Sequence, residues 1–144
     1  ETVQVEEFMA LETYATVFHL TSTVSGELKA GATPVDVLKA TFPGGSITGC
    51  PKIRSMRIIE ELEPTRRGIY TGILGYVSFS GDMDFNILIR TMLMKQRKTI
   101  FNAGAGIVAD SSPEAEYEEV LIKAKAMREA LIMITARQKH SLRV

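Results

Sequence analysis

An alternation of polar and apolar positions marks the first clear element of the chain. Residues 14–28 are rich in β-branched and aromatic side chains, with a period close to two. His19 and Thr21 fall on one face of this segment, and Phe18 and Leu20 fall on the other. The pattern predicts a strand. The dozen residues at the start of the chain give no firm assignment.

Two helices are predicted next. Thr33 can cap a helix, Pro34 suits its first position, and Asp36 places an acid in the first turn. The Pro-Gly-Gly segment 43–45 ends this short helix. A second helix is expected to begin near Pro51, because apolar residues then recur three positions apart, and the next proline of the chain stops it.

Residues 69–109 resemble a three-stranded antiparallel meander. The turn dipeptide Gly81-Asp82 and a charged tip at residues 96–98 separate its expected strands. These strands are expected around residues 72–79, 85–94 and 99–107.

A long helix is expected after the meander. Ser112-Pro113 signals its start, and the residues that follow are mostly good helix formers. We expect it to run to about Arg137, with a tail over residues 138–144.

Composition narrows the possible functions. The 144 residues contain 17 basic and 17 acidic side chains, one cysteine and two histidines. This balance gives no bulk attraction to nucleic acid or anionic lipid, and the counts exclude an internal disulfide or a zinc site built from Cys and His alone. No apolar run reaches the roughly 18 residues of a membrane span, and the start is no signal peptide. Single Cys50 favours a reducing compartment, so a cytoplasmic location is expected.

Two glutamates and a lysine on the last helix form the strongest local signal. Glu116, Glu119 and Lys123 fall within a sector of about 60° on a helix. Neighbouring carboxylates suit Mg²⁺, which takes one or two of them and leaves room for water and substrate. The alternative is a solvated helix face on which Glu119 and Lys123 form an ordinary pair.

Glycine-rich segments offer backbone donors for an anion. Gly104-Ala105-Gly106 closes the expected third strand just before the long helix, and the loop 43–52 places Ser46 among three glycines. A strand bulge and an ordinary connection are the respective alternatives.

Three further side chains could contact a ligand. Arg90 lies in an apolar stretch, so its charge must be paired within the protein or must bind a ligand. Its guanidinium can form two parallel hydrogen bonds with a carboxylate. His19 could be catalytic or a satisfied core histidine. Tyr70 could donate to a ligand or close the edge of the core.

In order, these signals resemble the C-terminal part of the chorismate-utilising enzymes, which include anthranilate, aminodeoxychorismate, isochorismate and salicylate synthases. Together the matching strings cover most of residues 14–123. They are FHLTSTVSGEL (18–28), FPGGSITGCPK (42–52), ELEPTRRGIYTGILGY (61–76), MDFNILIRT (83–91) and NAGAGIVADSSPEAEYEEVLIK (102–123).

The resemblance implies a fold and a reaction. The fold would be of the α+β class, a two-layered antiparallel β-sandwich with flanking helices, and residues 1–144 would form the C-terminal part of its chorismate-binding domain. The second and fourth strings most resemble component I of aminodeoxychorismate synthase, which replaces the C4 hydroxyl of chorismate with an amino group on the way to p-aminobenzoate and folate. Anthranilate synthase component I, of tryptophan biosynthesis, and a catalytically incomplete chorismate-binding module are the alternatives.

The resemblance also assigns roles to residues. Glu116 and Glu119 would hold Mg²⁺, directly or through water, and this ion would bind the ring carboxylate. Lys123 would sit beside them and limit their negative charge. His19 would lie where the C4 hydroxyl departs, and Ser46 would face the substrate.

The other carboxylate of chorismate, on its enolpyruvyl group, would be held by a second set of residues. Arg90 and Tyr70 would grip it, and the backbone of Gly104, Ala105 and Gly106 would add donors.

Partners follow from the same resemblance. A separate glutamine amidotransferase subunit would supply ammonia. The family's partner carboxylates and a Pro-Ile-x-Gly-Thr segment would precede Glu1, so we expect the chain alone to be inactive or nearly so. We also expect exposed apolar edges, which would associate with the N-terminal part of the domain or with a second copy.

Overall fold

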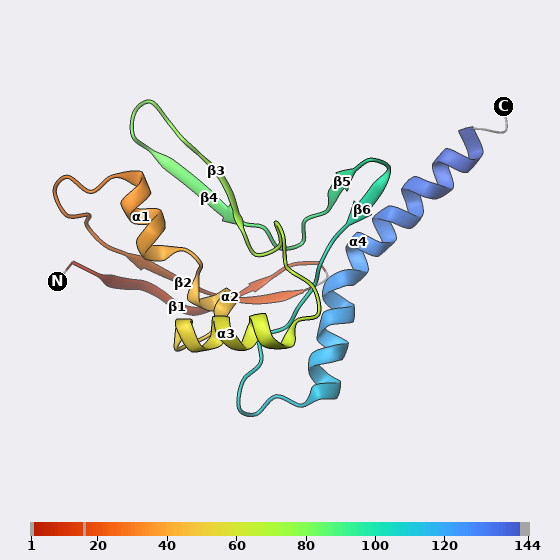
Figure 1. The fold of residues 1–144 in the computed structure, drawn as a ribbon, viewed down its shortest axis with the longest axis horizontal. Coiled ribbons are helices and arrows are strands. Elements are labelled where there is room, and N and C mark those ends of the chain that lie inside the picture. The colour runs from red at the N-terminus through yellow and green to blue at the C-terminus, as the bar shows by residue number, and fades with distance from the viewer. Residues whose placement is uncertain (1, 16, 142–144) are drawn as a thin grey trace. The chain divides into compact units, whose positions relative to one another are not determined.

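The computed structural model describes residues 2–15 and 17–141, and six strands and four helices lie within them (Figure 1). The chain divides into two compact units, Glu1–Ala40 and Thr41–Val144. The elements are β1 Gln4–Thr13, β2 Phe18–Ser25, α1 Pro34–Thr41, α2 Gly45–Thr48, α3 Lys52–Leu62, β3 Ile73–Val77, β4 Met83–Ile87, β5 Leu93–Lys95, β6 Lys98–Ile100 and α4 Pro113–Ser141.

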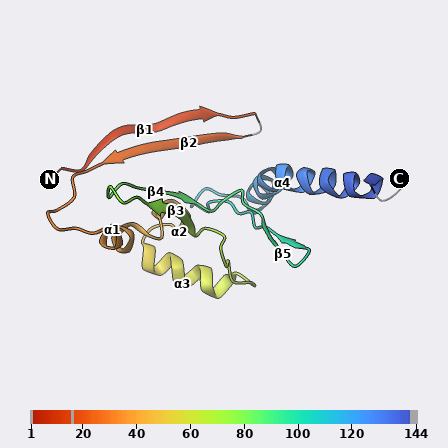
Figure 2. The same cartoon turned by 90° about the horizontal axis from the view of Figure 1, so that it is seen from above.

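The first unit is built on an antiparallel hairpin of β1 and β2, which run side by side as a long ribbon (Figure 2). The predicted strand is confirmed over Phe18–Ser25, a shorter stretch than expected. Its partner β1 carries several glutamates, and a bulge between Glu7 and Ala10, with Met9 at a positive φ of 51°, breaks its alternation. That interruption explains why the sequence of β1 shows no regular alternation of polar and apolar residues.

Helix α1 begins after the predicted cap Thr33, which forms a capping box with Asp36. The backbone N–H and the hydroxyl of Thr33 both donate to Oδ2 of Asp36, at 3.0 and 2.6 Å. The N–H of Asp36 donates back to the Thr33 hydroxyl at 3.3 Å. These reciprocal bonds satisfy donors that a helix start leaves unpaired.

The second unit starts with two helices. The four-residue α2 lies inside the glycine-rich loop and is too short for sequence periodicity to detect. Helix α3 is confirmed, and it ends where expected because Pro64 forces the preceding residue, Glu63, into an extended conformation at φ −75° and ψ 125°.

The expected three-stranded meander is wrong. Strand β3 pairs with β4, and β5 pairs with β6, as two separate hairpins. The predicted middle strand is broken between Ile87 and Leu93, where Arg90 adopts a positive φ of 52° that ends extended pairing. The predicted third strand stops at Ile100, so residues 101–107 lie outside it and Gly104 does not close a strand.

The long helix α4 is confirmed at its start. Ser112 caps it, because its hydroxyl accepts the N–H of Ala115 at 3.2 Å. The helix runs through Ser141, beyond its expected end, so only residues 142–144 of the expected tail remain, and they lie outside the described residues.

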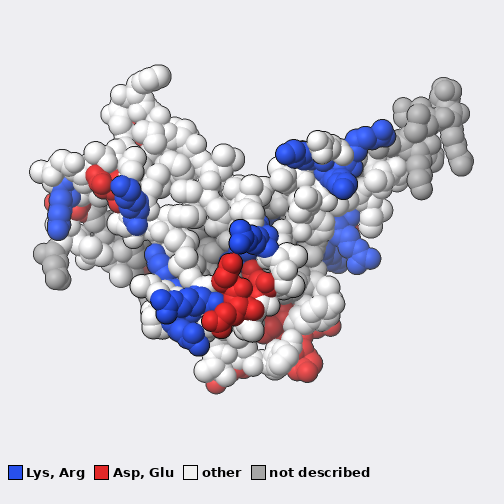
Figure 3. All heavy atoms as spheres, viewed as in Figure 1, with Lys and Arg blue, Asp and Glu red and all other residues white. Residues whose placement is uncertain are grey.

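Few side chains are buried. Met127, at 6% exposure, is the one apolar side chain classed as buried in the part of the chain that the structure describes. The expected exposure of apolar edges is confirmed, for example by Phe8 and Leu62, each 75% exposed. In residues 2–15 and 17–141, no helix has the length and apolar character needed to cross a bilayer. On the face in Figure 3, some groups of charged side chains mix basic and acidic residues, whereas the group at the upper right is basic only.

Candidate functional site

A tight double turn after α3 presents Tyr70. The N–H of Tyr70 donates to the carbonyl of Arg67, and the N–H of Gly72 donates to the carbonyl of Ile69, each at 3.0 Å. The β-branched residue Thr71 adopts a φ of +64°, which is unfavourable for its side chain and persists only where neighbours enforce it. The N–H of Thr71 also donates to the carbonyl of Leu88 at 3.0 Å, so β4 and its extension hold the turn.

The turn places the Tyr70 hydroxyl against the backbone of Gly104. A Cβ atom added to Gly104 would lie 2.8 Å from the Tyr70 Oη, which is closer than real Cβ contacts allow. Glycine is therefore required for this approach. Two predicted ligand residues, far apart in sequence, thus meet. Burial raises the pKa of the Tyr70 phenol, and the positive charges of Arg67 and Arg90 act in the opposite direction.

Arg90 is not the buried strand arginine that its apolar neighbours indicated. It lies exposed on a bend, outside β4. Its positive charge acts to lower the pKa of the Tyr70 phenol, and the joint binding of a carboxylate by Arg90 and Tyr70 stays a prediction. The other predicted backbone donors differ in exposure, since Ala105 is half-buried and Gly106 is exposed.

Sequence reasoning missed an ion pair beside this turn. The Nε of Arg67 donates to both carboxylate oxygens of Glu63, at 2.9 and 3.1 Å, and Nη2 donates to Oε1 at 2.6 Å. The guanidinium carbon of Arg67 also lies 5.8 Å from the centre of the Tyr70 ring. The string ELEPTRRGIYTG contains both residues of this pair, but the sequence predictions use only Tyr70 from it.

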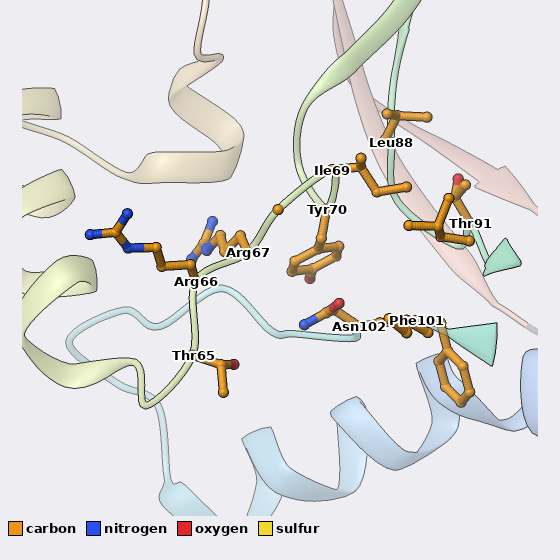
Figure 4. A pocket seen from close by; sticks show the side chains of 12 residues that line it. Thr65, Arg66, Arg67, Ile69, Tyr70, Leu88, Thr91, Phe101 and Asn102 are labelled. Carbon is orange, nitrogen blue, oxygen red and sulfur yellow. The ribbon is translucent and has the colours of Figure 1, made fainter. Parts of the chain in front are cut away.

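A cavity of about 350 Å³ adjoins the same turn. In Figure 4 the Tyr70 ring lies between Arg67 and Asn102, whereas the Arg66 side chain extends away from it. The wall combines apolar, aromatic and polar groups, the mixture typical of small-molecule sites. Its lining residues are Thr65, Arg66, Arg67, Gly68, Ile69, Tyr70, Leu88, Thr91, Leu93, Ile100, Phe101 and Asn102.

Glu116 stands out among the predicted metal ligands. Its Oε1 accepts a hydrogen bond from the Ser111 hydroxyl at 2.5 Å. Its Oε2 is buried and has no hydrogen-bond partner among the described residues. An unpaired buried oxygen costs about 1–3 kcal/mol, and more when charged, so a donor or a cation at this position would relieve the cost.

Glu119 and Lys123 lie on the same helix but behave differently. Their side chains form the ion pair that the solvated-face alternative predicted, and that of Glu119 is 49% exposed. Glu119 therefore has a partner in the chain itself, whereas one oxygen of Glu116 has none in the described part.

Mg²⁺ prefers oxygen ligands, and the carboxylates of α4 offer them. The residues that the structure describes contain no group of three or more His, Cys, Asp or Glu side chains able to hold an ion. One or two carboxylates suffice for Mg²⁺ when water and substrate complete its shell, and the unpartnered oxygen of Glu116 has the required chemistry. The carboxylates of α4 therefore fit as part of a magnesium site and do not form a complete one.

The two remaining predicted residues are Ser46 and His19. Ser46 is exposed on α2. His19 belongs to the first unit, where it is half-buried on β2 opposite Glu12, and its ring meets that of Tyr14 edge-on at 5.8 Å. Within the second unit, the structure thus brings Tyr70 and Gly104 together.

Comparison with known proteins decides the family. The sequence model of the chorismate binding enzymes matches residues 1–129. The chain belongs to the chorismate binding enzyme family. It is 56% identical over 129 residues to the anthranilate synthase component 1 of Aquifex aeolicus, and 53% identical over 129 residues to the aminodeoxychorismate synthase component 1 of Bacillus subtilis. These matches cover 90% of the chain but only 26% and 27% of the relatives, so the chain spans about a quarter of their length.

Solved structures agree with this assignment. The anthranilate synthase component I of Streptococcus pneumoniae is 51% identical and superposes with a TM-score of 0.80, over 88% of this chain and 29% of that one. A Bacillus anthracis protein described as a 2,3-dihydroxybenzoate-specific isochorismate synthase is 31% identical, with a TM-score of 0.82 over 90% and 35%. The predicted resemblance to chorismate-utilising enzymes is therefore confirmed at the level of the family, with more than one branch represented.

Proposed function

We propose that the chain forms part of the active site of an enzyme that aminates chorismate. The observation that supports this most is the contact of the Tyr70 hydroxyl with the backbone of Gly104, which Arg90 would join. A phenol, backbone N–H groups and a guanidinium are all hydrogen-bond donors, and such a set suits a carboxylate. Here it would hold the enolpyruvyl carboxylate, with Ala105 and Gly106 extending the backbone donors.

The opposite end of the substrate would be held through carboxylates of α4. Glu116, with its unpartnered oxygen, and Glu119 would hold Mg²⁺, and bound Mg²⁺ would neutralise the ring carboxylate of chorismate. Lys123 would keep the local charge from becoming too negative while it pairs with Glu119. Fixing both carboxylates would orient the ring for reaction.

The reaction proposed is the one of aminodeoxychorismate synthase component I. Ammonia, supplied by a glutamine amidotransferase subunit, forms the new C–N bond, and the C4 hydroxyl leaves as water. His19 would sit where the hydroxyl departs, and Ser46 would face the substrate. The match of 53% identity to the Bacillus subtilis protein supports this choice.

Anthranilate synthesis is the second candidate, because the Aquifex aeolicus relative is 56% identical. Both reactions aminate chorismate, but anthranilate formation also eliminates pyruvate. In either case, the strands described here would complete a two-layered sandwich with the rest of the domain, and the exposed apolar side chains would be covered there or by a second copy.

Product analysis tests the proposal. The gene product that contains these residues is incubated with chorismate, Mg²⁺ and either ammonium or glutamine with the amidotransferase. Aminodeoxychorismate without pyruvate is expected, and anthranilate with one pyruvate per turnover would select the second candidate. Unconsumed chorismate would refute both. The 144-residue chain alone is expected to be inactive under the same conditions.

A further inference from the structure

We infer that Glu63 and Arg67 act together as a brace that positions Tyr70 for substrate carboxylate binding. This inference rests on the proposed function for its substrate, whereas the geometry of the brace stands independently. Neither residue is a catalytic group here, because both act through Tyr70.

The brace starts at the end of α3. Pro64 fixes Glu63 in an extended conformation, and the carboxylate of Glu63 then receives the Arg67 guanidinium in a forked arrangement of three hydrogen bonds at 2.6 to 3.1 Å. Forked pairs restrict the orientation of the guanidinium plane, which a single contact does not. This bonding pattern raises the pKa of Arg67, so its charge is constant at physiological pH.

The held guanidinium acts on the Tyr70 turn at two points. It lies 5.8 Å from the centre of the Tyr70 ring, within the range of cation–π attraction. Its Nη1 also donates to the Thr71 hydroxyl at 3.4 Å, and Thr71 is the residue with the unfavourable φ of +64°. A strained turn needs such support from its surroundings.

The far end of Tyr70 has little freedom. Its hydroxyl meets the Gly104 backbone so closely that a methyl group would not fit between them. A small rotation of the ring would therefore move the hydroxyl off the backbone donors with which it is proposed to bind a carboxylate. Small misplacements of binding groups can cost as much as about 100-fold in rate.

A double-mutant cycle on the gene product tests the brace. Arg67→Ala is expected to raise KM for chorismate about 10-fold with a much smaller change in kcat, and to have little further effect in a Tyr70→Phe background. Glu63→Gln, a milder change, is expected to shift KM in the same direction. Arg57→Ala on the exposed side of α3 is the matched control and should leave KM unchanged.

Two outcomes in the kinetics would overturn the inference. One is that the effects of Arg67→Ala and Tyr70→Phe simply multiply. The other is that Arg67→Lys has the same KM as the unsubstituted protein. Lysine keeps the charge but cannot form the forked pair, so this result would show that the charge alone is the cause.

A second measurement does not depend on activity. In NMR spectra without substrate, Arg67→Ala should shift the Tyr70 ring resonance, identified by its loss in Tyr70→Phe, and the Gly104 amide, while Arg57→Ala should shift neither. Unmoved signals would overturn the brace. If the gene product fails to consume chorismate, the proposed function fails, and these shifts alone decide whether the brace exists.

Discussion

The polar groups of the two units are satisfied in different ways. In the first unit, Glu12 accepts hydrogen bonds at both oxygens, from Tyr14 at 2.5 Å and Thr21 at 3.0 Å, and Asp36 is enclosed by its capping box. In the second unit, Glu116 keeps a buried oxygen without a described partner, and the Tyr70 hydroxyl lies against bare backbone.

This difference indicates which side chains could still bind a ligand. Hydrogen bonds from Tyr14 and Thr21 lower the pKa of Glu12, so its charge is already stabilised and it needs no ligand. Among the described residues, only one oxygen of Glu116 accepts a hydrogen bond, although Glu116 is less exposed to water than Glu12. We therefore expect substitutions in the second unit to affect ligand binding, and those in the first unit near Asp36 to affect local stability only.

The largest expected effect belongs to Gly104. The substitution Gly104→Ala places a methyl group 2.8 Å from the Tyr70 oxygen, so Tyr70 or the backbone must move. The gene product should lose about 100-fold in kcat/KM for chorismate, because a binding group is displaced. Its free energy of unfolding, measured by chemical denaturation, should fall by about 1–3 kcal/mol through overpacking.

A second substitution isolates the cause of that effect. Tyr70→Phe removes the oxygen, and the next nearest Tyr70 atom to the added methyl is Cζ, at 3.9 Å. The stability lost in Gly104→Ala should therefore return in the double variant. If the double variant stays as unstable as Gly104→Ala, the contact between Tyr70 and Gly104 is not what requires glycine.

The effect expected next in size concerns Glu116 and Mg²⁺. In Glu116→Gln, the Mg²⁺ concentration for half-maximal activity should rise about 10-fold or more, because a charged ligand is lost. Saturating Mg²⁺ is expected to raise the melting temperature of the unsubstituted protein, and this increase should be smaller in Glu116→Gln.

Helix α4 provides a control one half-turn away. Glu114 is exposed in the first turn, so Glu114→Gln removes the same charge near the same helix start. It should leave the Mg²⁺ dependence unchanged. Equal effects of the two substitutions would mean that general electrostatics, and not a ligand at Oε2 of Glu116, explain the result.

Sequence predicted the helical part of the candidate site well. On a helix, spacing alone decides which residues share a face, so Glu116, Glu119 and Lys123 could be grouped in advance. Spacing also offered the pair of Glu119 with Lys123, which the structure contains. What spacing could not show is that Ser111 folds back onto Glu116, because that contact depends on side-chain rotamers and on the loop before α4.

The turn-based part of the site was harder to predict. An apolar stretch around Arg90 has the composition of a strand, and nothing local signals a positive φ at a non-glycine residue. The meeting of Tyr70 with Gly104 joins segments 34 positions apart, so no window of sequence contains it. The strings shared with the family identified both residues, although they gave no geometry.

The smallest expected effect lies in the first unit, at Asp36. Hydrogen bonds from Thr33 lower the pKa of Asp36 in the folded chain below its ordinary value of 3.8. A lowered folded-state pKa means that the stabilisation is fully present above 3.8 and is lost as the pH falls through the folded-state value. Asp36→Asn should therefore reduce amide hydrogen-exchange protection in α1 at about pH 6. The two proteins should converge as the pH falls below the folded-state pKa of Asp36, and a difference that stays constant while the pH is lowered would show that the charge of Asp36 does not support the helix.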